Sequence, residues 1–208
     1  MAISEKYGDD RRTEIVNVSG EVDIEDLIPV EDCVFTMTDF GYIKRIPMDE
    51  YQTQRRGGKG IKGLTRREDD IVQTMFTAST HDQIAFFTSK GRTFRLKGYE
   101  IPEGSRTSKG MNIINLLPLE ADEKITSMNR IIDGDEHKYI CMFTRNGIIK
   151  RSRAEEYKNI RKSGVIAITL DEGDELVFVV ATHGECDLLL ATANGQAVRF
   201  SESNVRAM

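Results

Sequence analysis

The octapeptide Thr38-Asp-Phe-Gly-Tyr-Ile-Lys-Arg45 decides the fold, because its pattern returns three more times in the chain of 208 residues. The later copies read Thr88-Ser-Lys-Gly-Arg-Thr-Phe-Arg95, Thr144-Arg-Asn-Gly-Ile-Ile-Lys-Arg151 and Thr192-Ala-Asn-Gly-Gln-Ala-Val-Arg199. In every copy a Thr stands three residues before a Gly, and an Arg stands four residues after it. The successive glycines are 50, 56 and 48 residues apart, so the chain is a repeat with a period of about 50 residues.

Each copy has the pattern of a β-hairpin. An apolar run precedes every one of these glycines, as in Val34–Met37 and Ile84–Phe87, and a β-prone run follows it. Glycine supplies the positive φ that such turns need. A second glycine, at positions 60, 110 and 164, comes 17 to 19 residues later and opens another short apolar stretch. An acidic turn and a further strand then complete the unit, as in Leu176–Val180.

The unit is therefore about four short strands, without a sustained helical period. Radial repetition of four-stranded sheets is the propeller architecture, in which each sheet is buried between its neighbours. The sequence predicts an all-β, pinwheel-like fold of about four blades, the last one truncated because the chain stops where the fourth unit's second glycine motif is due. We expect residues 1–14 to be a linker from an upstream domain. Residues 15–208 are expected to form the repeat domain, and Ile15–Val18 is expected to be its first strand.

The composition is that of a folded protein outside the membrane. Hydrophobic residues make up 39% of the chain, and there are only 4 prolines, which argues against disorder. No apolar run approaches the roughly 20 residues that span a bilayer, and the N-terminus lacks the apolar segment of a signal peptide. The three cysteines are far apart among apolar neighbours, which predicts reduced thiols and no metal site. We expect a cytoplasmic protein.

The charges are sharply segregated along the chain. The formal net charge is −5, which by itself argues against a nucleic-acid partner. Residues 42–67, however, hold eight Lys or Arg against two acidic residues, a local net charge of +6. Residues 90–110, 145–162 and 192–208 carry +4, +5 and +1, so the remainder of the chain carries −21. The basic windows recur with the repeat, which a uniformly solvated surface would not produce.

The most informative basic window contains the heptad Gln54-Arg-Arg-Gly-Gly-Lys-Gly60. Its cations alternate with glycines, so the backbone can come close to phosphates while the guanidinium groups make bidentate contacts. The corresponding loops of the next two units are basic as well. The candidate phosphate-contact residues are Gln54, Arg55, Arg56, Gly57, Gly58, Lys59, Gly60, Lys62, Arg66, Arg106, Lys109, Arg161 and Lys162.

The heptad reproduces in full the gyrase-A box, and the repeats around it resemble the C-terminal β-pinwheel of the DNA gyrase A subunit over nearly the whole chain. The segment Tyr7-Gly-Asp-Asp-Arg-Arg-Thr-Glu14 is similar to the junction that follows the breakage-reunion domain in that family. The family's pinwheel usually has six blades, so the resemblance implies that this chain is a fragment with about four.

The resemblance implies a domain that binds and wraps double-stranded DNA around its basic rim without reading bases. In the full type II topoisomerase, this wrap directs ATP-dependent negative supercoiling. The implied partners are the gyrase B subunit together with the rest of the gyrase A subunit in an A2B2 enzyme, with the fragment itself monomeric. ATP and magnesium act elsewhere in that enzyme, and we expect neither a cofactor nor a catalytic site in this fragment. Its own Gly57-Gly-Lys-Gly60 ends in Gly where a nucleotide-binding loop needs a hydroxyl.

Two alternatives stay open at this point. The C-terminal domain of the corresponding chain of topoisomerase IV has a similar fold with a degenerate or absent box, and a propeller-like protein-interaction module would need no nucleic acid. The role of the repeated arginine is also open, because a buried pair with an acidic turn and a contact to phosphate would both explain its recurrence. These four residues are Arg45, Arg95, Arg151 and Arg199.

Overall fold

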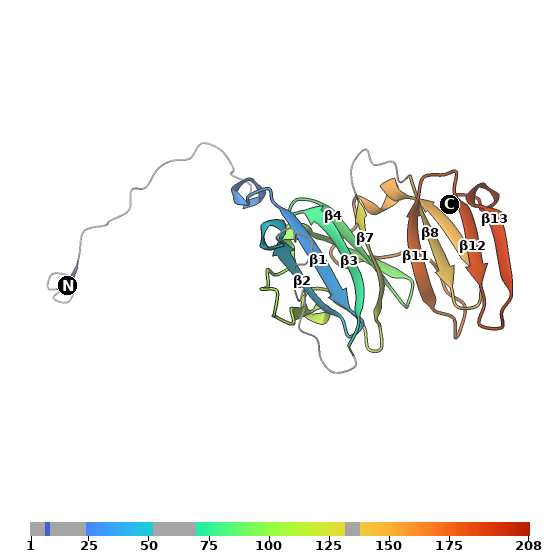
Figure 1. Ribbon diagram of the computed structural model, residues 1–208, viewed down its shortest axis with the longest axis horizontal. Helices are drawn as coiled ribbons and strands as arrows, with labels where there is room; N and C mark the ends of the chain where they lie inside the picture. Colours follow the sequence, from blue (N-terminus) through green and yellow to red (C-terminus); the bar gives the residue numbers. More distant parts are fainter. Residues whose placement is uncertain (1–6, 9–23, 52–69, 132–137) are drawn as a thin grey trace, which may run out of the picture.

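The computed structural model describes residues 7–8, 24–51, 70–131 and 138–208. Within these ranges the protein is built from β-strands and short 3-10 helices, and its sheets follow one another in chain order (Figure 1). The strands are β1 (Asp32–Thr38), β2 (Tyr42–Pro47), β3 (Val72–Ser79), β4 (Gln83–Thr88), β5 (Arg92–Lys97), β6 (Met111–Asn112), β7 (Ile125–Ile131), β8 (Tyr139–Thr144), β9 (Ile149–Arg153), β10 (Val165–Ile166), β11 (Leu176–Thr182), β12 (Asp187–Ala191) and β13 (Ala197–Ser201). The 3-10 helices are η1 (Ile24–Leu27), η2 (Met48–Glu50), η3 (Gly98–Glu100), η4 (Ile113–Asn115), η5 (Ala154–Tyr157) and η6 (Glu202–Asn204). The predicted all-β repeat fold is confirmed.

The repeated octapeptide forms the turn of a hairpin in every unit. The hairpins are β1–β2, β4–β5, β8–β9 and β12–β13, all antiparallel. Gly41, Gly91, Gly147 and Gly195 have φ values of 78°, 74°, 90° and 79°, which is the left-handed conformation expected of them. The repeated Thr also has a local role: the Oγ1 of Thr38, Thr88, Thr144 and Thr192 accepts the backbone N–H four residues on. Thr and Gly therefore recur because they build the turn.

Two of the four sheets contain a strand from the following unit. The sheet orders are β3-β1-β2-β6, β10-β5-β4-β7, β11-β8-β9 and β12-β13. The sequence predicts about four consecutive strands in each unit, whereas β6 leaves the second unit to pair with β2 of the first. In the same way β10 leaves the third unit to pair with β5 of the second. Neighbouring blades are thus joined by shared sheets as well as by side-chain packing.

The second glycine of the unit makes this exchange possible. Gly110 has a φ of 86° immediately before β6, and an added Cβ there would lie 2.4 Å from the carbonyl oxygen of Ile43 in β2. Gly164 has a φ of 77° before β10, and its Cβ would lie 2.6 Å from the ring of Phe94 in β5. Only glycine allows the returning chain to approach the preceding sheet so closely.

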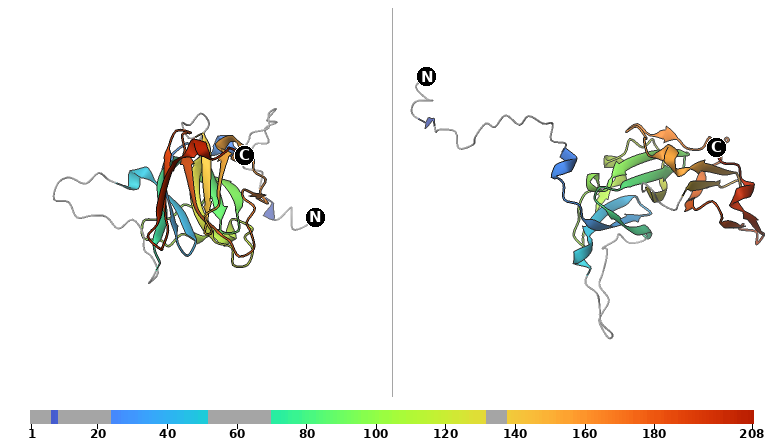
Figure 2. Two further views of the ribbon diagram at one scale, coloured as in Figure 1. Left: turned by 90° about the vertical axis from the view of Figure 1, so that its right-hand side faces the viewer. Right: turned by 90° about the horizontal axis from the view of Figure 1, so that it is seen from above.

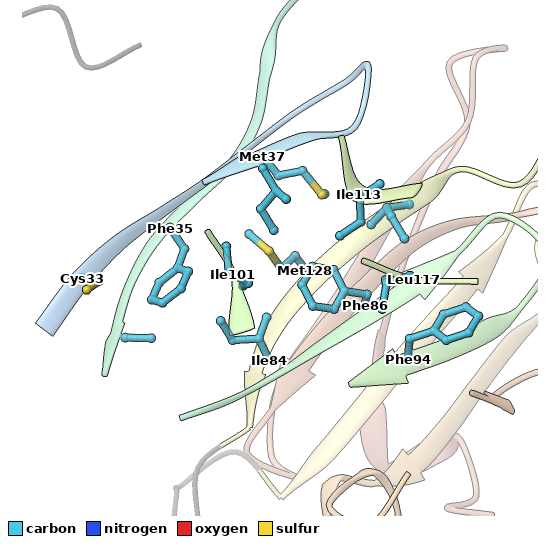
Figure 3. Packing of buried hydrophobic residues seen from close by; sticks show 13 residues of the cluster. Cys33, Phe35, Met37, Ile84, Phe86, Phe94, Ile101, Ile113, Leu117 and Met128 are labelled. Carbon is cyan, nitrogen blue, oxygen red and sulfur yellow. The ribbon is translucent and has the colours of Figure 1, made fainter. Parts of the chain in front are cut away.

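The core lies between successive sheets, because the first strand of each of the first three hairpins, β1, β4 and β8, is buried on both faces. In β4, Ile84 and Phe86 pack in the cluster shared with the first sheet, and Ala85 and Phe87 pack in the cluster shared with the third. Figure 3 shows side chains of β1 and of β4 pointing toward one another between the first two sheets. Strand alternation therefore turns the continuous apolar runs of the sequence into a stack of sheets.

One edge of each sheet lies inside the stack and the other lies at its rim. Strand β7 contacts both β3 and β11, the inner-edge strands of the sheets on either side. The hydroxyl of Thr126 in β7 donates to the carbonyl of Leu176 in β11, 3.0 Å away. The exchanged strands β6 and β10 form the opposite, outer edges of their sheets. Figure 2 shows the sheets from above, in chain order from blue to red.

Candidate nucleic-acid interface

The basic loops of the second and third units precede the exchanged strands and therefore lie at the rim. Residues 101–110 lead from η3 in the second sheet to β6 on the first, and residues 158–164 lead from η5 to β10 on the second. Lys109, Arg161 and Lys162 are exposed, and Arg106 is half-buried. The structure thus brings the basic residues of each loop to an outer sheet edge. The heptad from Gln54 to Gly60, and Lys62 and Arg66, lie outside the described residues, as does Ile15–Val18.

The four candidate cations of these two loops, Arg106, Lys109, Arg161 and Lys162, have at most weak ion pairs among the described residues. Arg106 Nε lies 4.0 Å from Glu50, and Lys162 Nζ lies 3.8 Å from Glu100, with the Lys162 side chain 98% exposed. Among the described residues, no carboxylate lies within ion-pair distance of Lys109 or Arg161. Exposed pairs at these distances are worth about 1 kcal/mol or less, so the loop cations can turn to another anion.

Cations at the hairpin turns have a different environment. Arg145 and Glu175 are 3.0 Å apart, and Lys90 and Glu120 are 3.2 Å apart. Arg92 contacts both Glu120 and a second, buried carboxylate, each at 3.1 Å. The acidic turns of the sequence therefore neutralise the cations beside them. Arg106, Lys109, Arg161 and Lys162 of the rim loops have no ion pair this short among the described residues.

The loop of the second unit is held by two consecutive residues of β2. Arg45 donates from Nε to the carbonyl of Ile101 at 2.9 Å, and its Nη1 lies 3.2 Å from Glu103. Its backbone N–H bonds the carbonyl of Pro102, and its own carbonyl accepts from Gly104, both at 3.0 Å. Arg45 therefore fixes residues 101–104, the first half of the loop.

Lys44 fixes the second half of the same loop. It is 1% exposed, and its Nζ donates to the carbonyl oxygens of Ser105, Arg106 and Ser108 at 2.9, 3.0 and 3.0 Å. Burial lowers the pKa of the Lys44 ammonium from its ordinary value, because removal from water disfavours the charged form. The sequence counts Lys44 within a basic window, whereas the structure places it in the interior.

A hollow of about 650 Å³ opens beside this loop. Its walls include the hydroxyl-bearing residues Ser105 and Ser108, the amides Asn112 and Asn115, and Lys109. Hydroxyl, amide and ammonium groups are the side chains that proteins use to contact phosphate and sugar. The lining also includes Glu103 and the apolar side chains of Pro102 and Met111, so the hollow combines one cation and one carboxylate with a mainly apolar surface.

The structure shows what each repeated arginine contacts. Arg45, Arg95 and Arg151 each donate to a backbone carbonyl of the following unit, those of Ile101, Lys158 and Glu202. Arg199 is exposed and pairs instead with Asp187 of its own hairpin. The contacts of the first three are between blades, which is a structural reason for their recurrence. A phosphate contact by any of the four stays a prediction.

Arg151 belongs to a buried polar network. Its Nη1 donates to the Glu202 carbonyl at 2.8 Å and lies 3.7 Å from the Glu202 carboxylate, which is itself fully buried. The carboxylate also accepts from the Thr182 hydroxyl and from the backbone N–H groups of Gly184 and Cys186. Burial alone would raise the pKa of Glu202, but these hydrogen bonds outweigh it and hold the pKa below its ordinary value. The network joins the third blade to the fourth.

Comparison with known proteins identifies the repeat. The family described as "DNA gyrase C-terminal domain, beta-propeller" matches residues 34–79, 82–131, 138–183 and 187–208, one match for each unit. The chain belongs to the DNA gyrase C-terminal domain family. The DNA gyrase A subunit of Clostridium acetobutylicum is 50% identical over 206 residues, which are 99% of this chain and 25% of the relative. That of Halalkalibacterium halodurans is 47% identical over 208 residues, again 25% of the relative. The chain spans about a quarter of the length of the curated relatives it matches.

Solved structures agree with this membership in the gyrase family. A crystal structure of the C-terminal domain of DNA topoisomerase IV superposes with a TM-score of 0.75 at 31% identity, covering 87% of this chain and 55% of that one. A structure of a DNA gyrase A C-terminal domain superposes with a TM-score of 0.62 at 25% identity, covering 86% of this chain and 57% of that one. Within the described ranges, no helix has the length and apolar character needed to cross a bilayer.

Proposed function

We propose that this gyrase-family domain binds double-stranded DNA along its outer rim and bends it, so that DNA wraps around the blades. The observation that carries the proposal is the placement of the two described basic loops. Each precedes a strand at an outer sheet edge, and among the described residues Arg106, Lys109, Arg161 and Lys162 of these loops have at most weak ion pairs. Loops repeated from blade to blade would contact phosphates at successive points along a duplex.

The proposed binding is to shape and charge. The rim offers Lys and Arg side chains on loops, which neutralise phosphates, and the described residues include no long helix that could enter a major groove. The acidic turns keep negative charge on a different part of each blade, and screening over about 8 to 10 Å lets the rim act separately from them. In the sequence, the gyrase-A box stands at the position of the first unit that corresponds to the two described loops, so we assign it the same role.

We also propose that the domain acts within DNA gyrase. The domain would be part of a whole gyrase A subunit, which assembles with the gyrase B subunit into an A2B2 enzyme. In that enzyme, the DNA wrapped around the domain would support ATP-dependent negative supercoiling. The intact box and the 44–50% identity to several DNA gyrase A subunits support gyrase over topoisomerase IV. The domain itself is proposed to have no catalytic site or cofactor, because neither the wrapping role nor the residues that carry it require one.

The test is the salt dependence of duplex binding by the chain. Affinity should fall linearly with salt on logarithmic axes, equally for duplexes of scrambled sequence. A variant with Lys109→Gln and Arg161→Gln should lower the slope by about 0.9 for each phosphate interaction that the substitutions remove. The matched control, Lys90→Gln with Arg145→Gln, removes the same charge from the hairpin turns and should leave the slope unchanged. A flat salt response would reject DNA wrapping in favour of a protein-interaction module. An equal loss of slope in the control would reject the rim loops as the specific contact surface.

A further inference from the structure

Lys44 is a buried cation surrounded by the backbone of a loop. Its side chain has three donors and no acceptor, and all three donors are matched by the carbonyls of Ser105, Arg106 and Ser108. Burying an ammonium group is costly unless it is hydrogen-bonded in this way. A fully matched internal ammonium therefore holds these three peptide groups in one arrangement.

The repeat contains a counterpart that lacks this arrangement. Lys150 occupies the same position of the third unit, directly before the repeated arginine. It is half-buried, and its Nζ donates to the carbonyl of Ala167 at 2.7 Å, after β10 and outside the basic loop at residues 158–164. The interaction of Lys44 with the rim loop is thus specific to the junction of the first two blades, and not a general property of a lysine at this position.

Among the described residues, few other hydrogen bonds hold the loop between its fixed first half and β6. Within it, Ser108 donates to the Ser105 carbonyl from its backbone N–H at 3.1 Å and from its hydroxyl at 2.8 Å. These bonds close a local turn but do not attach it to the sheet. Lys44 makes that attachment, and it draws the three carbonyl oxygens inward. The negative ends of these peptide dipoles are thereby kept away from the surface that carries Arg106 and Lys109.

We propose that Lys44 is a positioning residue for DNA binding, an internal cation that preforms the rim loop 104–110 for phosphate contact. The inference rests on the proposed DNA-binding function but concerns a residue that never touches DNA. Without the Lys44 ammonium, the loop would have to be ordered when DNA binds. We expect a loss of affinity of about tenfold, because ordering the backbone of roughly one residue has such a cost.

The experiment compares Lys44→Ala with Lys150→Ala. Lys44→Ala should accelerate hydrogen exchange of the Ser108 amide, whose N–H donates to the Ser105 carbonyl, and weaken duplex binding about tenfold, while Lys150→Ala should do neither. Propylammonium replaces the atoms that Lys44→Ala removes, so at millimolar concentrations it should slow loop exchange and restore binding. Tetramethylammonium at equal ionic strength has no N–H donor and should not.

The wild-type chain provides a second test that does not require a variant to fold. If Lys44 preforms the loop, the Ser108 amide, which donates to the Ser105 carbonyl at 3.1 Å, is already protected in the free protein and gains little protection when duplex DNA is added. Rapid exchange of the Ser108 amide in the free wild-type chain would overturn the proposal, and so would unchanged exchange of this amide and unchanged affinity in Lys44→Ala. If the wild-type chain failed to bind DNA, the proposed function would be rejected. The comparison of hydrogen exchange between wild type and Lys44→Ala would still show whether Lys44 orders the loop.

Discussion

The substitution Arg151→Met tests whether Arg151 holds two blades together or contacts DNA phosphate. The Arg151 side chain is 10% exposed. The substitution removes its 2.8 Å hydrogen bond to the Glu202 carbonyl and its positive charge, which lies 3.7 Å from the Glu202 carboxylate. It also removes the packing of the guanidinium group over the Tyr139 ring, whose centroid is 4.3 Å away. Removing one partner of a buried charge pair costs about 3 to 5 kcal/mol, because the other charge is left without compensation. Glu202 keeps its bonds from Thr182 and two backbone N–H groups, so we expect a destabilisation of about 3 kcal/mol, the lower end of that range.

Arg199→Met is the matched control at the same position of the repeat. Its ion pair with Asp187 is exposed, and such pairs are worth about 1 kcal/mol or less. The chain has no Trp, so urea unfolding is followed by far-UV circular dichroism. A large shift of the midpoint for Arg151→Met and a small one for Arg199→Met is the expected result. If both shifts were small while Arg151→Met reduced DNA affinity and its salt slope, the clamp would be refuted and Arg151 would be a phosphate contact.

Three further predictions follow from the contacts. Because the pKa of Glu202 is depressed in the fold, its carboxylate stabilises the fold above its ordinary pKa of 4.5, and this contribution is lost as the pH falls through the folded pKa. The difference in unfolding free energy between wild type and Glu202→Gln should therefore be constant near neutral pH and shrink below about pH 4.5. A difference that grew with acid would contradict the network. In thermal unfolding, Gly110→Ala should destabilise the chain by several kcal/mol more than Gly147→Ala. A Cβ at Gly110 would lie 2.4 Å from the Ile43 carbonyl oxygen, whereas a Cβ at Gly147 would have no neighbour within 4 Å. Equal effects would mean that β6 does not need this close approach. Replacing the three cations of the gyrase-A box by Ala should lower the salt slope of DNA binding by about 0.9 per contact, while the chain still binds DNA. In the full enzyme, the same substitutions should abolish negative supercoiling while relaxation persists. Unchanged supercoiling would mean that the box has no role in wrapping.

The local part of the fold was predictable from the sequence. Thr, Gly and the flanking apolar runs act within a few residues of one another, so the four hairpins and the strands at Ile125, Leu176 and Val72 could be located. The strand exchange could not be predicted. Met111–Asn112 is too short to identify its partner, and β2 would accept a strand from its own unit as readily as one from the next. The choice depends on how the returning chain passes Gly110, which is a tertiary property.

The site was predictable to the extent that it consists of exposed cations. The basic loops at Arg106 and Arg161 recur in register with the repeat, and the structure brings both to the rim. The inward-facing cations could not be distinguished from them. The partners of Arg45 and Lys44 are mainly backbone carbonyls, which every residue has, so no sequence pattern marks a lysine or arginine that binds them. A lysine between the apolar Ile43 and Ile46 was the available signal for burial.

The central claim is that the rim bends DNA and does not merely attract it. The direct measurement is the topology of a nicked circular DNA that is sealed by ligase while the chain is bound, followed by removal of the protein. We predict that the topoisomer distribution shifts as the amount of bound chain increases, and that Lys109→Gln with Arg161→Gln reduces the shift at equal occupancy. Saturating, salt-sensitive binding that leaves the linking number of the sealed circles unchanged would contradict the account.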